Sequence, residues 1–232
     1  MSFLKNKVWI VETIIFLLIF VWAFIHVSYL FRPLSSNRAN VVGYYVEEPD
    51  SIDVVLIGGS STYVFWAPYT AWDECGMVSY DFSTDSMSPS LIIGMIEEAK
   101  KTQNPEVFVI DLRALEVRES HEGFYSEAYL RNVTDSFKYS RNRIDTINYS
   151  FGVEQPQIQK DPAMYFDFMM YHSRWQNLSE KSFRYANNSV ASQYKGFKLV
   201  TMAFHSTLQM NDYSYVTESG ELSEETNKIL ID

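Results

Sequence analysis

The chain has 232 residues, of which 47% are hydrophobic and 21% are charged. This composition excludes a disordered or low-complexity protein, because the apolar fraction is sufficient for a packed core. The formal net charge of −10 argues against nucleic-acid binding, which needs a basic surface, and the single cysteine excludes a disulfide framework and a cysteine-rich zinc site.

The first predicted element is a membrane-spanning helix. Nineteen residues from Thr13 to Phe31 contain no Asp, Glu, Lys or Arg, and with the residues back to Val8 they are long enough to cross about 30 Å of hydrocarbon. The amino terminus and two lysines before the stretch make that side slightly more basic than the other side. We therefore expect a single-pass cell-membrane protein with the N-terminus inside and residues 32–232 extracytoplasmic. A cleaved signal peptide is the alternative, although the apolar stretch is long for one and no small-residue cleavage site follows it.

The predicted organisation has three parts. Residues 1–31 form the cytoplasmic tip and transmembrane helix, residues 32–50 a polar and irregular tether, and residues 51–232 the extracytoplasmic domain. Residues 1–31 carry a net +1, which leaves −11 for the remainder. We expect anionic lipid head groups to repel such an acidic domain, so that it does not lie flat on the membrane.

Strand and helix patterns alternate after the tether. A β-branched run from Asp53 to Ile57 is typical of a parallel strand covered on both faces, and it ends at Gly58-Gly59-Ser60-Ser61. The residues that follow predict a helix over 68–75 that stops at Gly76, and then a short strand over 78–82.

A second helix and a third strand continue the alternation. Pro89 opens a helix whose buried stripe consists of Leu91, Ile92, Met95, Ile96 and Ala99, and Asn104-Pro105 ends it. A second fully apolar strand covers 107–110 and ends at Asp111. The alternation predicts an α/β fold with a doubly wound parallel sheet.

The remainder of the chain gives weaker signals. Residues 116–150 and 180–186 have helical patterns, and 195–204 fits a strand or a surface hairpin. Residues 223–232 open as a helix and end without a following strand, which indicates an incomplete polypeptide. Four carboxylates are expected to be solvated charges rather than metal ligands, and no metal or other cofactor is expected: Asp161, Asp167, Glu218 and Glu221.

Three polar clusters follow the three predicted strands: residues 58–62, residues 83–88, and Asp111 with Arg113. Ligands of parallel α/β sheets bind outside the carboxyl ends of the strands, so these clusters are expected to form one site. A serine directly after a buried strand and flanked by glycine can project its hydroxyl for nucleophilic attack. The alternative is that this segment only turns a strand into a helix, with Ser61 or Thr62 as the N-cap.

The segments DVVLIGGSSTYVFWAP, SYDFSTDSMS, FVIDLR and YHSRW together resemble the membrane-anchored SGNH/GDSL-like hydrolases of Gram-positive bacteria. That group is related to proteins of teichoic-acid D-alanylation and polysaccharide O-acetylation. The resemblance covers residues 50–175. It implies a flavodoxin-like, three-layer α/β/α domain with a parallel sheet, preceded here by the transmembrane helix.

The resemblance also implies roles for individual residues. Ser60 falls on the nucleophile of the family, with Ser61 as the alternative, and Ser83 falls where a backbone N–H holds the oxyanion. Gly59 occupies a position usually held by Asp or Ser. Gly59, Ser61, Asp111 and Arg113 are expected to contact substrate, although Arg113 could instead simply pair with Asp111.

One element of the family is absent from the sequence. The family takes its base and orienting acid from an Asp-x-x-His segment, and no such segment occurs in residues 1–232. The expected function is that of an esterase or acyltransferase acting on acyl esters of envelope glycans or teichoic-acid-like polymers, with little activity from these residues alone. The alternative is a non-catalytic envelope protein that binds a glycan or partners a membrane-bound O-acyltransferase.

Overall fold

The computed structural model describes residues 2–113, 115, 125–158 and 161–199. The strands are β1 (Val54–Ile57), β2 (Ser79–Asp81) and β3 (Val107–Ile110). The α-helices are α1 (Ser2–Phe31), α2 (Ser36–Tyr44), α3 (Ser60–Phe65), α4 (Pro68–Cys75), α5 (Ile92–Ala99), α7 (Glu127–Thr134), α8 (Arg141–Glu154), α9 (Asp167–Tyr171) and α10 (Glu180–Ala186). Short 3-10 helices are η1 (Pro89–Leu91), η2 (Pro162–Met164) and η3 (His172–Asn177).

The three strands form a parallel sheet in the order β2-β1-β3, so the first strand lies in the middle. Val55 pairs with Tyr80 on one side and with Phe108 on the other. Because side chains alternate along a strand, these three residues share one face of the sheet. The prediction of a mixed α/β fold with a parallel sheet is confirmed, and all three strands lie within the predicted ranges.

The main hydrophobic core lies on that face. It joins the sheet to α2, η1, α5 and α8 through side chains that are almost fully buried: Tyr44, Val55, Tyr80, Leu91, Met95, Ile147 and Phe151. The predicted stripe of α5 accounts for part of this core. On the other face, α4 packs against β2, and Trp66 Nε1 donates a hydrogen bond to Ser79 Oγ at 2.9 Å.

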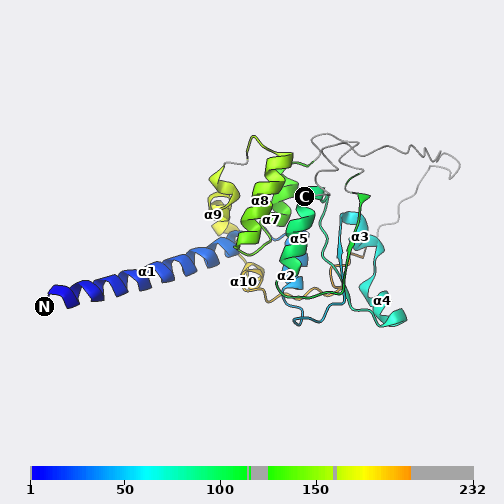
Figure 1. The fold of residues 1–232 in the computed structure, drawn as a ribbon, viewed down its shortest axis with the longest axis horizontal. Helices are drawn as coiled ribbons and strands as arrows, with labels where there is room; N and C mark the ends of the chain where they lie inside the picture. Colours follow the sequence, from blue (N-terminus) through cyan, green and yellow to red (C-terminus); the bar gives the residue numbers. More distant parts are fainter. Residues whose placement is uncertain (1, 114, 116–124, 159–160, 200–232) are drawn as a thin grey trace.

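Helix α1 projects from the rest of the molecule as one long helix (Figure 1). Its segment Val8–Phe31 has 24 residues and contains an 18-residue stretch with a mean hydropathy of 2.6, so it is long and apolar enough to cross a membrane. Helices α9 and α10 lie beside its C-terminal end, whereas α3 and α4 lie on the distant side of the domain (Figure 1).

The prediction of an irregular tether over 32–50 was wrong for residues 36–44, which form the buried helix α2. Ser35 caps this helix by accepting a hydrogen bond from the backbone N–H of Arg38 at 3.0 Å. Asn40 Nδ2 donates to the carbonyl oxygens of Asp81 and Ser83, at 2.7 and 2.8 Å. The helix was missed because its buried residues include Asn37, Arg38 and Asn40 as well as apolar ones, so the sequence shows no continuous apolar stripe.

Two further expectations differ from the structure. Strand β3 is not covered on both faces in the part of the chain described, since Val107 and Val109 are 49% and 44% exposed. Residues 195–199 form turns and loop instead of a strand. Residues 116–124, residues 200–204 and the predicted helix at 223–232 lie outside the described residues.

Candidate functional site

The site begins at the turn between β1 and α3, where Gly58 has no room for a side chain. A Cβ atom at Gly58 would lie 1.9 Å from Thr62 Oγ1 and 2.7 Å from Asp111 Cβ. A Cβ atom at Gly59 would lie 4.0 Å from its nearest neighbour, Ser61 Oγ. The end of β1 is therefore packed tightly against α3 and the end of β3, whereas the neighbouring position is open.

The two candidate serines differ in their surroundings. Ser60 is the first residue of α3, follows the N-cap Gly59 and is exposed. Among the described residues its hydroxyl has no hydrogen-bond partner. Ser61 Oγ instead donates a short hydrogen bond to Asp111 Oδ2. Within the part of the chain that the structure describes, the hydroxyl of Ser60 is therefore free to contact a ligand, whereas that of Ser61 is bonded to the protein.

Asp111 joins the ends of β1 and β3. Its carboxylate also accepts hydrogen bonds from Thr62 Oγ1, at 3.2 Å, and from the backbone N–H of Arg113, at 3.0 Å. Burial alone would raise the pKa of Asp111, but the hydrogen bonds from Ser61 and Arg113 lower this pKa below its usual value. Asp111 is therefore an anion at neutral pH that fixes the first turn of α3.

Both expectations for Arg113 remain open in this geometry. Its Nε lies 3.6 Å from Asp111 Oδ1, which makes a long ion pair, and its side chain is 56% exposed. The guanidinium also lies 5.9 Å from the ring centroid of Phe65. Such a pair leaves most of the guanidinium donors available to an anionic ligand.

Ser83 lies at the end of β2 and is 4% exposed. Its Oγ donates to the carbonyl oxygen of Leu56 at 3.4 Å, so the side chain serves the protein rather than a ligand. The next residue, Thr84, donates its backbone N–H to the carbonyl oxygen of Gly58 at 3.1 Å. This bond holds the loop after β2 against the loop that carries Ser60.

A polar cluster that sequence reasoning did not single out lies beside α3. Tyr63 Oη donates a short hydrogen bond to Asp85 Oδ1, and Lys198 Nζ lies 3.3 Å from the same oxygen. Lys198 Nζ also lies 3.7 Å from the centroid of the Tyr63 ring. Burial and the bond to Asp85 raise the pKa of Tyr63. Asp85 belongs to the predicted cluster 83–88, but no sequence signal pointed to Lys198.

No histidine of the described residues lies in the loops around Ser60. His26 is part of α1, and His172 begins η3, where its Nδ1 lies 3.0 Å from the carbonyl oxygen of Met169. His121 and His205 lie outside the described residues. A serine beside an ionised aspartate is not activated, because a carboxylate with a low pKa is a weak base. The described residues thus supply an exposed hydroxyl and backbone donors, without a general base.

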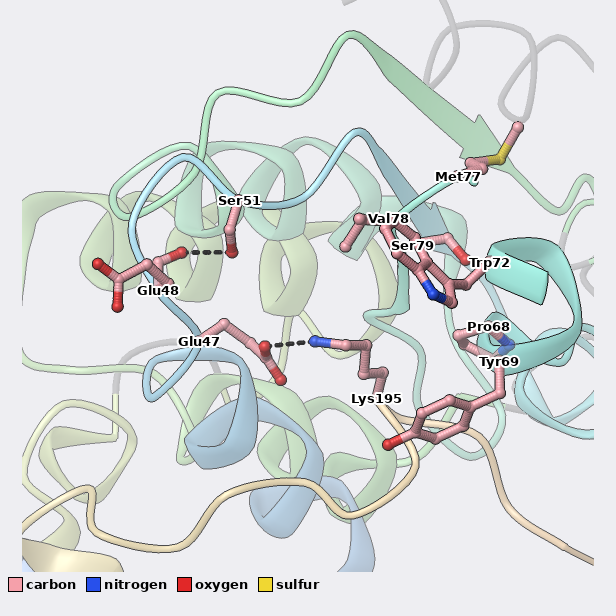
Figure 2. Close-up of a pocket in the computed structure, with 10 residues that line it drawn as sticks. All are labelled: Glu47, Glu48, Ser51, Pro68, Tyr69, Trp72, Met77, Val78, Ser79 and Lys195. Carbon is pink, nitrogen blue, oxygen red and sulfur yellow. Dashed lines mark hydrogen bonds and ion pairs between the residues drawn. The ribbon is translucent and has the colours of Figure 1, made fainter. Parts of the chain in front are cut away.

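A cavity of about 400 Å³ lies elsewhere, near the first residue of β2. Figure 2 shows Trp72, Tyr69 and Pro68 on one side of it and the ion pair of Lys195 and Glu47 on another. Lys195 Nζ lies 2.5 Å from Glu47 Oε2. This cavity is at the opposite end of β2 from Ser83 and does not include the predicted site residues.

The strand order adds one argument for the site at Ser60. In doubly wound sheets, ligands bind where the strand order reverses, outside the carboxyl ends of the strands. Here the reversal lies between β1 and β3, and Ser61 and Asp111 meet at that point. Comparison of the chain with protein-family models, curated proteins and solved structures found no match.

Proposed function

We propose that the chain is a membrane-anchored serine esterase or O-acyltransferase with an extracytoplasmic, SGNH-type three-layer domain. In this proposal the hydroxyl of Ser60 attacks an acyl ester of a cell-envelope glycan or a teichoic-acid-like polymer. The observation that carries the proposal is the position of Ser60: exposed, unpartnered among the described residues, and at the first residue of a helix that follows the central strand.

The proposed step is acyl transfer. Ser60 Oγ forms a bond to the carbonyl carbon, the alcohol oxygen of the substrate leaves, and an acyl-serine remains. Water or a glycan hydroxyl then takes the acyl group. The backbone N–H groups of Ser60 and Ser83 are the proposed oxyanion donors. A base must take the Ser60 proton, and because residues 1–232 contain no Asp-x-x-His, we expect turnover by these residues alone to be low.

Arg113 fits the substrate class in this proposal. Its guanidinium is more than half exposed next to the strand ends that carry Ser60, and guanidinium groups pair well with phosphate and carboxylate. A polymer with such groups would be held near the nucleophile.

The test of this function is the acyl-ester content of envelope polymers in cells that carry Ser60→Ala. Loss or gain of esters relative to the wild type supports the proposal, and Ser51→Ala is a control, since Ser51 contacts Glu48 beside the cavity of Figure 2. An unchanged ester content with Ser60→Ala would favour the alternative, a binding or accessory partner of a membrane-bound O-acyltransferase. That alternative is supported by the described residues, which place no general base near Ser60.

The proposed orientation, with the N-terminus inside, has its own test. Cys75 is the only cysteine of the chain and is exposed on α4. A membrane-impermeant maleimide should therefore label Cys75 in intact cells from which the outer envelope layers have been removed. Labelling only after lysis would contradict this orientation.

A further inference from the structure

Residues 166–186 wrap around the C-terminal end of α1, and we call this segment the collar. It contains α9, η3 and α10, all of which pack against α1. In Figure 1, α9 and α10 lie beside the part of α1 that enters the domain. The collar is thus the part of the domain nearest to the proposed membrane span.

The collar exposes large apolar side chains. Trp175 is 62% exposed and Phe183 is 52% exposed. Others with at least 40% exposure are Phe166, Met169 and Met170. Exposed apolar groups gathered on neighbouring elements are typical of a contact surface, and tryptophan is enriched where proteins cross the membrane–water interface.

The length of α1 places this surface at the level of the membrane. Between Val8 and Trp22 nearly all large apolar side chains of α1 are exposed, but from Ala23 onward most are partly or fully covered. Counted from Val8, the residue after the charged Lys7, this exposed stretch has 15 residues, which is about 22 Å of helix at about 1.5 Å per residue. A hydrocarbon core of about 30 Å needs roughly 20 residues. A span that begins at Val8 therefore needs the covered part of α1 to complete it, and the collar lies beside that part.

Ring contacts show how far back along α1 the collar reaches. Phe168 lies 5.7 Å from Phe31 and 5.8 Å from Phe24, between ring centroids. Phe166 lies 6.4 Å from Phe24. Phe24 precedes the last residue of α1 by seven positions, or about 10 Å along the helix. This agrees with the missing length of roughly 8 Å.

Charge and rigidity also fit a position in the membrane interface. Residues 166–186 contain three basic and two acidic side chains, so they carry a net +1 in a chain of −10. Asp167 was expected to be a solvated charge, but it is fully buried and its carboxylate binds Arg32, at 2.5 Å, and Arg143. Arg174 Nη1 donates to the carbonyl oxygen of Phe31 at 3.3 Å. These contacts fix the collar to the end of α1.

We propose that the collar is embedded in the outer half of the lipid bilayer interface, with Met169, Trp175 and Phe183 in contact with lipid. The inference rests on the proposed membrane span of α1 but does not depend on the chemistry at Ser60. An embedded collar holds the domain at a fixed height and tilt above the membrane. The irregular tether expected from the sequence would instead leave the acidic domain free to move.

The test measures the lipid exposure of single labelled cysteines in the full chain. The natural Cys75 on α4 carries an environment-sensitive nitrobenzoxadiazole label as the control distant from the collar. In a Cys75→Ser background, the label is placed in the collar with Met169→Cys or Phe183→Cys, and in the span with Ile15→Cys. Each protein is reconstituted into vesicles of phosphatidylcholine and phosphatidylglycerol that contain nitroxide-labelled lipids.

At the expected depth of about 5–10 Å, the collar labels should lose about half of their fluorescence to a nitroxide near the head groups. The label at position 15 should respond most to a nitroxide deep in the acyl chains, and the label at Cys75 to neither. Quenching at position 15 without quenching at either collar position would overturn the collar proposal and leave the span intact. Absence of quenching at position 15 would overturn both.

Discussion

The packing at the turn after β1 predicts that the same substitution will affect stability differently at the adjacent positions Gly58 and Gly59. Replacement of Gly58 by Ser places a Cβ 1.9 Å from Thr62 Oγ1 and 2.7 Å from Asp111 Cβ, far below the 3.5–4.0 Å at which such atoms attract each other. Thr62 and Asp111 must move apart. The same substitution at Gly59 meets nothing closer than 4.0 Å, and Ser is a favourable N-cap.

The expected cost of Gly58→Ser follows from two effects. Overpacking costs about 1–3 kcal/mol, and loss of the Thr62 hydrogen bond to the Asp111 carboxylate adds roughly 1 kcal/mol. The sum of about 2–4 kcal/mol corresponds to a fall in Tm of roughly 4–16 °C for a protein of this size. Gly59→Ser should stay within about 0.5 kcal/mol of the wild type.

The assay is thermal and denaturant unfolding of the full chain in detergent, followed by tryptophan fluorescence. A change in the denaturant midpoint without a change in slope identifies a stability effect. Equal stabilities of the two variants would refute the tight packing of Gly58 against α3 and β3, and with it the geometry of the site.

Three further predictions concern buried polar groups, and the same unfolding assay checks each of them. Burial raises the pKa of Asp81 to about 8, so the folded state keeps a proton that the unfolded state loses near pH 4. Stability should fall as pH rises from about 4 to 8, and Asp81→Asn should remove this fall and be the more stable protein at pH 8 by a few kcal/mol; a wild-type stability that is flat over this range would contradict the buried position. Arg143→Met leaves the buried Asp167 with one partner fewer and should lower the free energy of unfolding by about 3–5 kcal/mol. Arg141→Met is the control at an exposed ion pair and should not change this free energy measurably. Similar results for the two variants would be inconsistent with the buried network. Asn40→Ala removes two hydrogen bonds to the carbonyl groups at the end of β2 and should cost about 1–3 kcal/mol, and a neutral effect would argue against the role of α2 in holding that strand.

Local sequence patterns were sufficient to predict elements such as β1 and α4, whose own residues mark where they begin and end. The strand β1 is an uninterrupted apolar run, and its four residues are all buried. Helix α4 ends at Gly76, which has a φ of 70° in the left-handed region that favours glycine. The rule for ligand sites in parallel sheets also brought Ser61 and Asp111 to the same place, and the structure shows them in contact.

Local sequence patterns could not predict the polar contacts between residues that are far apart in the chain. Arg32 and Asp167 are 135 positions apart in the chain, and nothing near either residue marks it as a buried partner. Helix α2 was missed for a related reason, because the buried Asn40 donates hydrogen bonds to backbone carbonyl groups that lie 41 and 43 positions further along the chain. The sequence left Ser60 and Ser61 as alternative nucleophiles, and it gave no sign that the Ser61 hydroxyl bonds to Asp111 while the Ser60 hydroxyl does not.

The central claim is that Ser60 is the nucleophile, and covalent labelling tests it most directly. The protein extracted from its own membranes is treated with a fluorophosphonate, digested, and analysed by mass spectrometry to find the modified serine. We predict modification at Ser60, retained in Ser61→Ala and abolished in Ser60→Ala. Modification that persists in Ser60→Ala, or no modification of the native protein at all, would contradict the claim.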